Sequence, residues 1–515
     1  MVSLLLLPAF LALLILAERW SKSRRRLSLP PGPKPWPIIG NVLDMPAVQP
    51  WKKYQEWCKM YKSDVIFLDL PTQPTIILGS AKAAWDLLDK KSQIYSDRTQ
   101  SVMVQLMNWE FGLGMIPYTS WWRANRRMFH QQFHQGVADN FRPVQRQHTR
   151  EFLSWALEDP ANTRKHVRRL IAAIIVTVTY GKRIASMDDE YVTVVQTAME
   201  GLSKATVPGM FWIEFFPFLK HVPSWVPGMT SKKIAEWYKQ FVIEMREKAF
   251  LEVKAAVNNG SAPPSVTATI IEDNNEKYSG TGDEHFYEEI AKNVTGSAYA
   301  GGADTTASAC LSFLLAMAMF PEVQSRAQAE LDQVVGPTRL PEYEDIAQMP
   351  YVQATMMETM RWMAVTPFGI PHVSTEEDIY EGYQIPKGSV VVPNVWAMLH
   401  DEEIYPEPEA FKPERFLHKN GTINRDVQDP TTIAFGFGRR VCPGRYFSSN
   451  TLSIFIASVL HVFNITGGTD ASGKPVLLST EMEGGLVATP LDVPCGLRPR
   501  FAAAAQLIQG IEGDA

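Results

Sequence analysis

Cysteine is scarce in this sequence. The 515 residues include four, Cys58, Cys310, Cys442 and Cys495, and no two of them have the Cys-x-x-Cys spacing of a metal or redox motif. So few cysteines in so long a chain exclude a disulfide framework and favour a body that folds in a reducing compartment. Most are expected to be small buried side chains, and Cys442 differs because of its neighbours.

Runs of like charge are also nearly missing. Lys and Arg number 50 against 55 Asp and Glu, a net charge of −5, and the longest basic run is at 24–26. Proteins that bind nucleic acids usually show a basic face, so the sequence argues against a nucleic-acid partner. Hydrophobic residues make up 45% of the chain, which is enough for a deep core.

One long uncharged apolar run is found, at 2–17. As a helix it would span about 24 Å, and about 28 Å if it extends to Trp20, close to the ~30 Å core of a bilayer. Positive charge follows the run, which favours an uncleaved anchor with a cytoplasmic basic side over a cleaved signal peptide. The expected segments are an anchor helix at 1–20, a basic and proline-rich hinge at 21–40, one large domain at 41–502 and a tail at 503–515.

Beyond residue 41 the pattern predicts a mainly α fold with small β-sheets. Residues 258–285, rich in Asn, Gly and Ser, are expected to be a long exposed connection. The regular elements expected with most support are a hairpin at 65–70 and 75–78 and helices at 286–319, 351–364 and 445–462.

Glycines surround Cys442 in the stretch 435–444. They let a backbone turn tightly and approach a flat ligand. A helix beginning at Arg445 would offer free N–H groups and a positive dipole end, which favour thiolate over thiol. A thiolate on haem iron donates electron density to it. The alternative is a buried cysteine in a glycine-rich turn.

This stretch resembles the haem-binding loop of cytochromes P450 at all five characteristic positions, which are Phe435, Gly438, Arg440, Cys442 and Gly444. The resemblance implies that 41–502 is a haem-binding catalytic domain of the cytochrome P450 fold. Haem b (iron protoporphyrin IX) would lie between the long central helix and the cysteine loop, with Cys442 as the axial ligand of its iron.

Two further motifs occur in the family's order. The resemblance implies a structural triad of Glu358, Arg361 and Arg415, built from a Glu-x-x-Arg motif and a later arginine. Residues 301–306 resemble the oxygen-activation motif, with Asp304 as proton gate and Thr305 stabilising the activated oxygen. An acid beside an alcohol in a distorted helix can relay protons, although a kinked core helix with a solvated acid is the alternative.

Donors for the haem propionates are implied at four positions. Trp122 and Arg126 resemble the family's Trp-x-x-x-Arg helix, and their N–H groups suit a carboxylate. Arg440 and His372 match other propionate-facing positions. His372 stands where arginine is common, and an ordinary polar strand residue is its alternative.

The implied substrate pocket is an apolar chamber. Its segments, by order along the family fold, are 108–117, 207–216, 299–303, 366–370 and 484–487. The residues expected to line it, each of which taken singly is more often core than ligand contact, are Phe111, Met115, Ile116, Ala303, Phe368, Ile370 and Leu486.

The implied activity is insertion of one oxygen atom of O2 into a small apolar substrate. Electrons would come from NADPH through the FAD and FMN of NADPH–cytochrome P450 reductase, with cytochrome b5 as an optional donor, at the endoplasmic reticulum membrane. Stretches 385–388 and 394–398 resemble fungal microsomal members of secondary metabolism, which act on terpenoids, polyketides or aromatics, and oxidation of aromatic xenobiotics is a further option. An isomerase or dehydratase of P450 type, acting without O2, and a non-catalytic haem carrier are the alternatives; neither needs Asp304 and Thr305.

Overall fold

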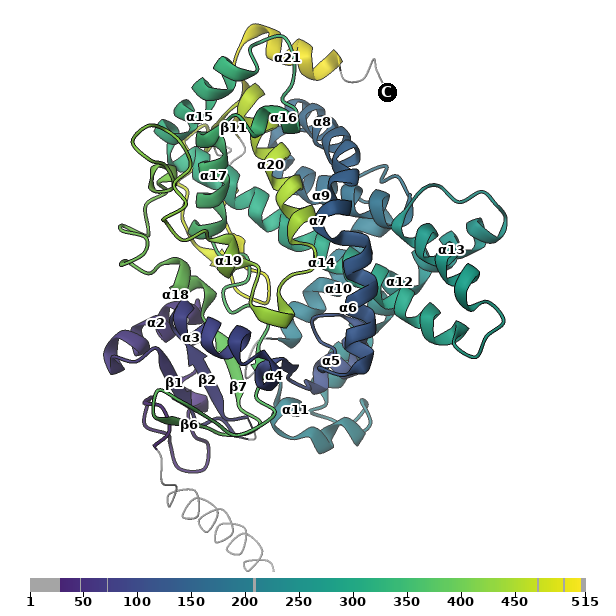
Figure 1. Cartoon of the computed structure of the whole chain (residues 1–515), viewed down its shortest axis with the longest axis vertical. Coiled ribbons are helices and arrows are strands. Elements are labelled where there is room, and N and C mark those ends of the chain that lie inside the picture. Colours follow the sequence, from purple (N-terminus) through teal and green to yellow (C-terminus); the bar gives the residue numbers. More distant parts are fainter. Residues whose placement is uncertain are drawn as a thin grey trace, which may run out of the picture.

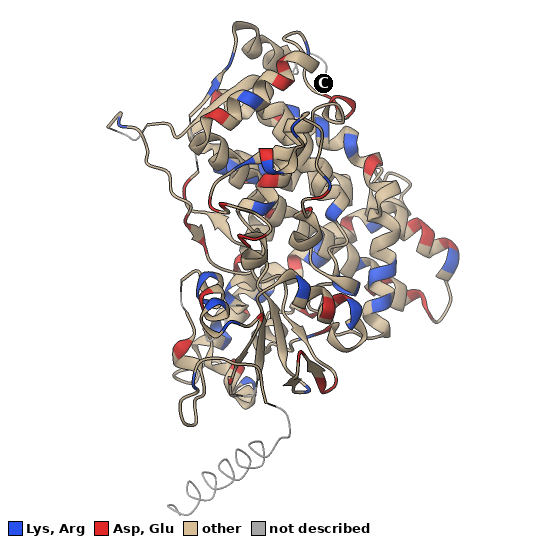
Figure 2. Cartoon of the chain, turned by 60° about the vertical axis from the view of Figure 1, so that its left-hand side comes forward, with Lys and Arg blue, Asp and Glu red and all other residues tan. Residues whose placement is uncertain are grey.

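The computed structural model describes residues 28–46, 48–71, 73–206, 210–469, 472–493 and 496–510 (Figure 1). The predicted anchor at 1–20, Cys495 and part of the predicted hinge lie outside the described residues. Figure 2 shows Lys and Arg interspersed with Asp and Glu over the helices, as the even composition predicts.

Helices dominate the molecule, and the mainly α fold class is confirmed. The longer ones are α2 (Pro50–Tyr61), α6 (Ser120–Phe133), α8 (Arg142–Glu158), α9 (Thr163–Tyr180), α10 (Glu190–Ala205), α12 (Thr230–Asn258), α13 (Val266–Tyr278), α14 (Glu284–Met319), α15 (Pro321–Val334), α17 (Pro350–Trp362) and α20 (Arg445–Val462). The short ones are α3 (Ala81–Ala84), α4 (Ser92–Tyr95), α5 (Val102–Leu106), α7 (Gln135–Ala138), α11 (Trp212–Phe215), α16 (Tyr343–Ile346), α18 (Val395–Leu399), α19 (Thr431–Ala434) and α21 (Ala502–Gln509).

The main sheet joins distant parts of the chain. Its order is β1 (Val65–Leu68), β2 (Thr75–Leu78), β7 (Val390–Pro393), β4 (His372–Val373) and β3 (Asp97–Arg98). The predicted hairpin is the antiparallel pair β1–β2, and β2 then pairs in parallel with β7. In the β3–β4 ladder Arg98 stands opposite His372, so strand pairing fixes these two basic residues side by side.

Three antiparallel pairs complete the small sheets. They are β5 (Asp378–Tyr380) with β6 (Tyr383–Ile385), β8 (Phe463–Thr466) with β11 (Gly496–Pro499), and β9 (Met482–Glu483) with β10 (Thr489–Pro490).

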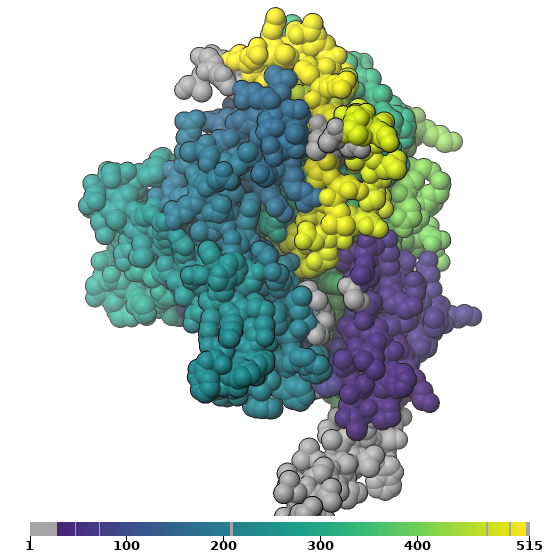
Figure 3. Space-filling view, turned by 180° about the vertical axis from the view of Figure 1, so that it is seen from behind, coloured from purple at the N-terminus to yellow at the C-terminus, as the bar shows by residue number. Residues whose placement is uncertain are grey.

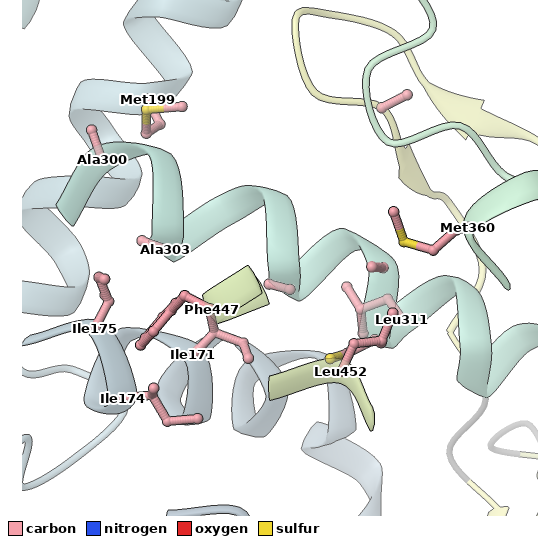
Figure 4. Close-up of a cluster of buried hydrophobic side chains, with 14 of the residues drawn as sticks. Ile171, Ile174, Ile175, Met199, Ala300, Ala303, Leu311, Met360, Phe447 and Leu452 are labelled. Carbon is pink, nitrogen blue, oxygen red and sulfur yellow. The ribbon is translucent and has the colours of Figure 1, made fainter. Parts of the chain in front are cut away.

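The core is organised around α14, a helix of 36 residues. Figure 4 shows Ala300, Ala303 and Leu311 along it, with isoleucines of α9 and the side chains of Phe447 and Leu452 from α20 around them. A Cβ on Gly302 would lie 2.8 Å from Ile175, so glycine allows the close approach of α9. In the described part of the chain α14 alone is long and apolar enough to cross a membrane, but 67% of that apolar window is buried, as in a core helix.

Two elements differ from the sequence prediction. The segment 258–285 is not one exposed connection, because α13 lies within it, capped by the Ser265 side chain and burying Val266, Ile270 and Ile271. The predicted tail contains α21, which buries Ala504 and Ile508. In both cases a short apolar face lies within polar or alanine-rich surroundings, where its period is hard to detect.

Candidate functional site

The Cys442 loop is held in shape by its backbone. The Cys442 N–H donates to the Phe435 carbonyl at 2.8 Å. Gly436 and Gly438 have φ values of +77° and +53°, which favour glycine. A Cβ on Gly438 would also clash with the Leu88 carbonyl oxygen, so both the positive φ and the close contact require glycine at this position.

Gly444 meets no such restriction. It precedes α20 with an ordinary φ of −94°. Apart from its two neighbours in the chain, no described residue has a heavy atom within 4 Å of where a Cβ on Gly444 would be. Open space beside the cysteine fits the close approach of a flat group, the role expected for this glycine.

Burial controls the electrostatics of Cys442. It raises the pKa of the thiol, while the Gly444 N–H, Arg126 and Arg445 lower this pKa to a smaller extent. The expectation that the helix start favours thiolate is therefore outweighed by burial in the protein itself. A metal ion removes the proton of a coordinating thiol outright, and these three groups are placed to stabilise the resulting anion.

Basic side chains converge beside the loop. Arg126, on α6, donates to the Val441 carbonyl at 2.7 Å. Arg440 donates to the carbonyls of Ser96 at 2.8 Å and Ile116 at 2.9 Å, and its guanidinium lies 4.2 Å from the centre of the Trp122 ring. These are three of the four residues expected to hold propionates, and the Trp122 indole donates to the Leu113 carbonyl at 3.2 Å.

Arg98 is a member of this cluster that the sequence analysis missed. It is 6% exposed and donates to the carbonyls of Ile370 at 2.6 Å and Pro371 at 3.0 Å. Among the described residues its Nε has no hydrogen-bond partner. No motif marks this arginine, and only the β3–β4 pairing reveals it.

The cluster has more buried positive charge than its neighbours neutralise. No described carboxylate forms an ion pair with Arg98, Arg126 or Arg440. Burial lowers the pKa of Arg98 well below its ordinary value and that of Arg440 to about 9, and Asp97 opposes both shifts. Buried unpaired charge is costly, so the cluster fits a ligand with carboxylates, such as the two propionates of haem.

His372 lies in the cluster, but its chemistry differs. Nδ1 faces the Tyr95 carbonyl at 2.6 Å and must therefore carry a proton. Burial, and next Arg98, hold the pKa of His372 well below its ordinary value. In this neutral form Nε2 accepts hydrogen bonds, so Arg98 and Arg440 are the better partners for an anion.

The middle of α14 faces open space. Gly301 is exposed although most of the helix around it is buried, and no side chain of the described residues lies within 4 Å of where its Cβ would be. The Thr305 hydroxyl donates to the Gly301 carbonyl at 2.7 Å, an ordinary bond for threonine in a helix. Burial raises the pKa of Asp304, with Arg168 opposing and Glu483 adding to the shift, so the carboxyl is shifted toward holding a proton.

The α14 motif and the cysteine loop are physically joined. The hydroxyls of Thr306 and Ser448 are 3.1 Å apart and link α14 to the first turns of α20. Figure 4 shows Phe447, from α20, on the side of α14 that bears Ala303. The residue that follows Thr305 in α14 is thus bonded to the helix that follows the cysteine loop.

The expected triad is brought together in the core. Glu358 and Arg361 are fully buried, with Arg361 Nε donating to the Glu358 carboxylate at 2.8 Å. Arg415, on a 3-10 turn (Pro413–Phe416), donates to both Glu358 oxygens at 3.1 Å. Further bonds to backbone carbonyls satisfy the guanidinium groups, as a buried ion pair requires.

The expected pocket residues divide into three groups. Phe111 lies against α14, 3.1 Å from where a Cβ on Gly296 would be, and Ile370 packs against Gly114. Phe368 instead packs on the rings of Trp51 and Tyr54, at 5.8 and 5.4 Å, as a core residue does. Buried or half-buried positions, each compatible with either role, are held by Met115, Ile116, Ala303 and Leu486; residues 207–209 lie outside the described chain.

A thiol loop, a buried cationic cluster and an acid–alcohol pair on a central helix are the parts expected of a haem-thiolate site. The profile named Cytochrome P450 matches residues 30–489. The chain belongs to the cytochrome P450 family and is an oxidoreductase of its monooxygenase class.

Several relatives of the chain are fungal proteins. Cytochrome P450 monooxygenase COX2 of Coprinopsis cinerea is 43% identical over 93% of this chain and 90% of its own length. Cytochrome P450 monooxygenase ple1 of Rhodocybe pseudopiperita is 40% identical over 95% and 93%. Tryptamine 4-monooxygenase of Psilocybe cyanescens is 38% identical over 94% and 96%.

Proposed function

We propose that this protein inserts one oxygen atom of O2 into a small apolar or aromatic compound of fungal secondary metabolism. Cys442 would ligate the iron of haem b, and Arg98, Arg126, Arg440 and Trp122 would hold its propionates. When bound, haem supplies the iron that activates dioxygen. The observation that carries the proposal is the contact between the Thr306 and Ser448 hydroxyls, which joins the turn of α14 that bears Asp304 and Thr305 to the helix that follows the cysteine loop.

The protein's own contribution to the chemistry is proton supply and shelter from water. Asp304, whose pKa is raised by burial, can hold a proton nearer to neutral pH than an exposed carboxyl can. Thr305 Oγ1 is fixed by the Gly301 carbonyl and can pass a proton on through its hydroxyl. Apolar side chains of α9 pack against α14 beside this pair, at Ala300 and Ala303 (Figure 4), and keep that side of the helix from bulk water.

Electrons would come from NADPH through the FAD and FMN of a cytochrome P450 reductase, with cytochrome b5 as an optional donor. Arg123 and Arg127 on α6 and Arg439 in the cysteine loop are exposed, and Arg126 ties this helix to the loop. A basic face there suits an acidic flavoprotein. We expect the rate of reduction to fall as ionic strength rises; a rate independent of salt would contradict docking by charge.

We also propose attachment to the endoplasmic reticulum membrane through 1–20, with the domain in the cytoplasm. Exposed apolar side chains support this, among them Ile38, which is 72% exposed with a φ of +71° that is unusual for a β-branched residue. Trp212 and Phe218, in and just after α11, are 70% and 65% exposed. In Figures 1 and 3 the N-terminal sheet region and α11 lie at the same end of the molecule.

The test is incubation of microsomes containing the protein and a reductase with indoles, terpenoids, polyketides and polycyclic aromatics. Mass spectrometry should find a product that has gained one oxygen atom only when NADPH is present. Product from a hydroperoxide without NADPH would instead support an isomerase. NADPH consumption unchanged by every compound would support a haem carrier.

A further inference from the structure

The carboxylate of Glu214 is bonded across to another helix. Glu214 lies on α11, and its Oε1 accepts from the Ser101 hydroxyl at 2.7 Å and from the Met103 N–H at 2.8 Å. Its Oε2 accepts from the Val102 N–H at 3.1 Å. A helix start leaves its first N–H groups unpaired and favours negative charge, so one carboxylate caps α5 from more than a hundred residues away along the chain.

The chain that follows α5 contacts α14. The chain continues from α5 through a 3-10 turn (Trp109–Phe111) to Phe111, which packs at Gly296. The Leu113 N–H then donates to the Ser297 hydroxyl at 3.0 Å. The segment that Glu214 holds therefore ends on the helix that bears Asp304 and Thr305.

The other face of α11 is exposed to the surroundings. Trp212 is 70% exposed and Phe216 46% exposed, whereas Ile213 is buried. The segment 212–216 thus presents aromatic side chains to the surroundings and the Glu214 carboxylate to the start of α5.

We propose that Glu214 is a latch between this outer aromatic segment and the pocket wall, and that apolar substrates enter where its three hydrogen bonds open. The inference rests on the proposed function, because it takes the space beside α14 as the pocket. Opening exchanges protein hydrogen bonds for bonds to water, which is reversible and has a small net cost. Such low-cost local opening is typical of segments that admit ligands.

Glu214→Gln in the haem-loaded enzyme tests the latch itself. The amide would turn its NH2 toward backbone N–H groups that need an acceptor. We expect the amides of Val102 and Met103 to exchange with deuterium about tenfold faster. Glu214→Asp keeps the charge and should restore part of the protection. Ser101→Ala removes one bond to Glu214 and also the cap on the Val104 N–H, so exchange should rise at Val104 and rise less at Val102 and Met103, from which Glu214 still accepts.

The gate is measured with 4-phenylimidazole, followed by stopped-flow absorption at the haem band. Association and dissociation rate constants should both rise about threefold or more in Glu214→Gln, while their ratio changes less than twofold, because a latch alters the barrier more than the end states. Glu236→Gln, which removes an exposed carboxylate on α12, is the matched control and should change neither rate.

Unchanged amide exchange overturns the proposal, because Glu214 would then not hold α5. Faster exchange with unchanged azole rates also overturns it, since the contact would serve packing alone. The azole reports access to iron whether or not oxygen is inserted. A protein that binds it but forms no oxygenated product therefore contradicts the proposed function without deciding the latch.

Discussion

The cysteine loop and the α5–α11 contact show two ways of fixing a segment. The loop is held by backbone: the Cys442 N–H bond to Phe435 and two glycines with positive φ. The α5–α11 contact depends on one side chain, Glu214, reaching a helix start. The first arrangement fixes the position of Cys442, the proposed iron ligand, whereas the second depends on three hydrogen bonds that can open. This contrast leads to predictions of decreasing size.

The largest effect is expected in the core that supports the loop. Glu358→Gln removes the charge that pairs with Arg361 and Arg415 and leaves both guanidinium groups buried without it. We expect a loss of about 3–5 kcal/mol in unfolding free energy. Urea unfolding measures it, and Glu402→Gln, which breaks the exposed pair with Lys59, should cost less than about 1 kcal/mol. Equal losses would show that burial of the triad is unimportant.

The loop's rigidity can be tested at its own glycines. Gly438→Ala should destabilise the protein by about 2–3 kcal/mol, because the methyl group meets the Leu88 carbonyl and φ is positive. Gly444→Ala, with ordinary φ and open space, should stay within about 0.5 kcal/mol. Thermal unfolding of both variants measures the two losses of stability. A larger loss for Gly444→Ala than for Gly438→Ala would contradict the rigidity ascribed to the loop.

Substitution of Asp304 is expected to lower activity without lowering stability. Asp304→Asn should lower turnover about tenfold to hundredfold by removing a proton donor. Because the folded-state pKa of Asp304 is raised, the wild type loses stability as pH rises from the ordinary carboxyl pKa through the folded one. The variant should therefore be at least as stable as wild type at neutral pH, and this advantage should vanish in acid. A variant destabilised at neutral pH would mean that the charged carboxylate is structural.

The smallest expected effect tests the cationic cluster. Arg98→Leu removes a buried guanidinium whose Nε is unsatisfied among the described residues, so apoprotein stability should hold or rise. Haem should leave about tenfold faster, since a partner of its carboxylates is lost. Transfer of haem to apomyoglobin measures this rate. An unchanged rate of haem dissociation would show that Arg98 does not bind a propionate.

Sequence predicted the parts of the site whose geometry is local. The Cys442 loop, the start of α20 at Arg445 and the Glu358–Arg361 pair follow from spacing within one turn or helix. Arg98 depends on strand pairing across 274 residues to His372, and Glu214 depends on a contact between two short helices. Neither leaves a periodic or motif signal. The prediction that 258–285 is an exposed connection was wrong for a related reason. The helix α13 forms there because it packs on neighbouring elements, which the sequence of the segment does not reveal.

The central claim is that the Cys442 thiolate binds haem iron. The purified protein, reduced and treated with carbon monoxide, should show its Soret band close to ~450 nm, and Cys442→His should shift this band to shorter wavelength while haem remains bound. A wild-type protein that holds haem but shows no band near ~450 nm would contradict the account.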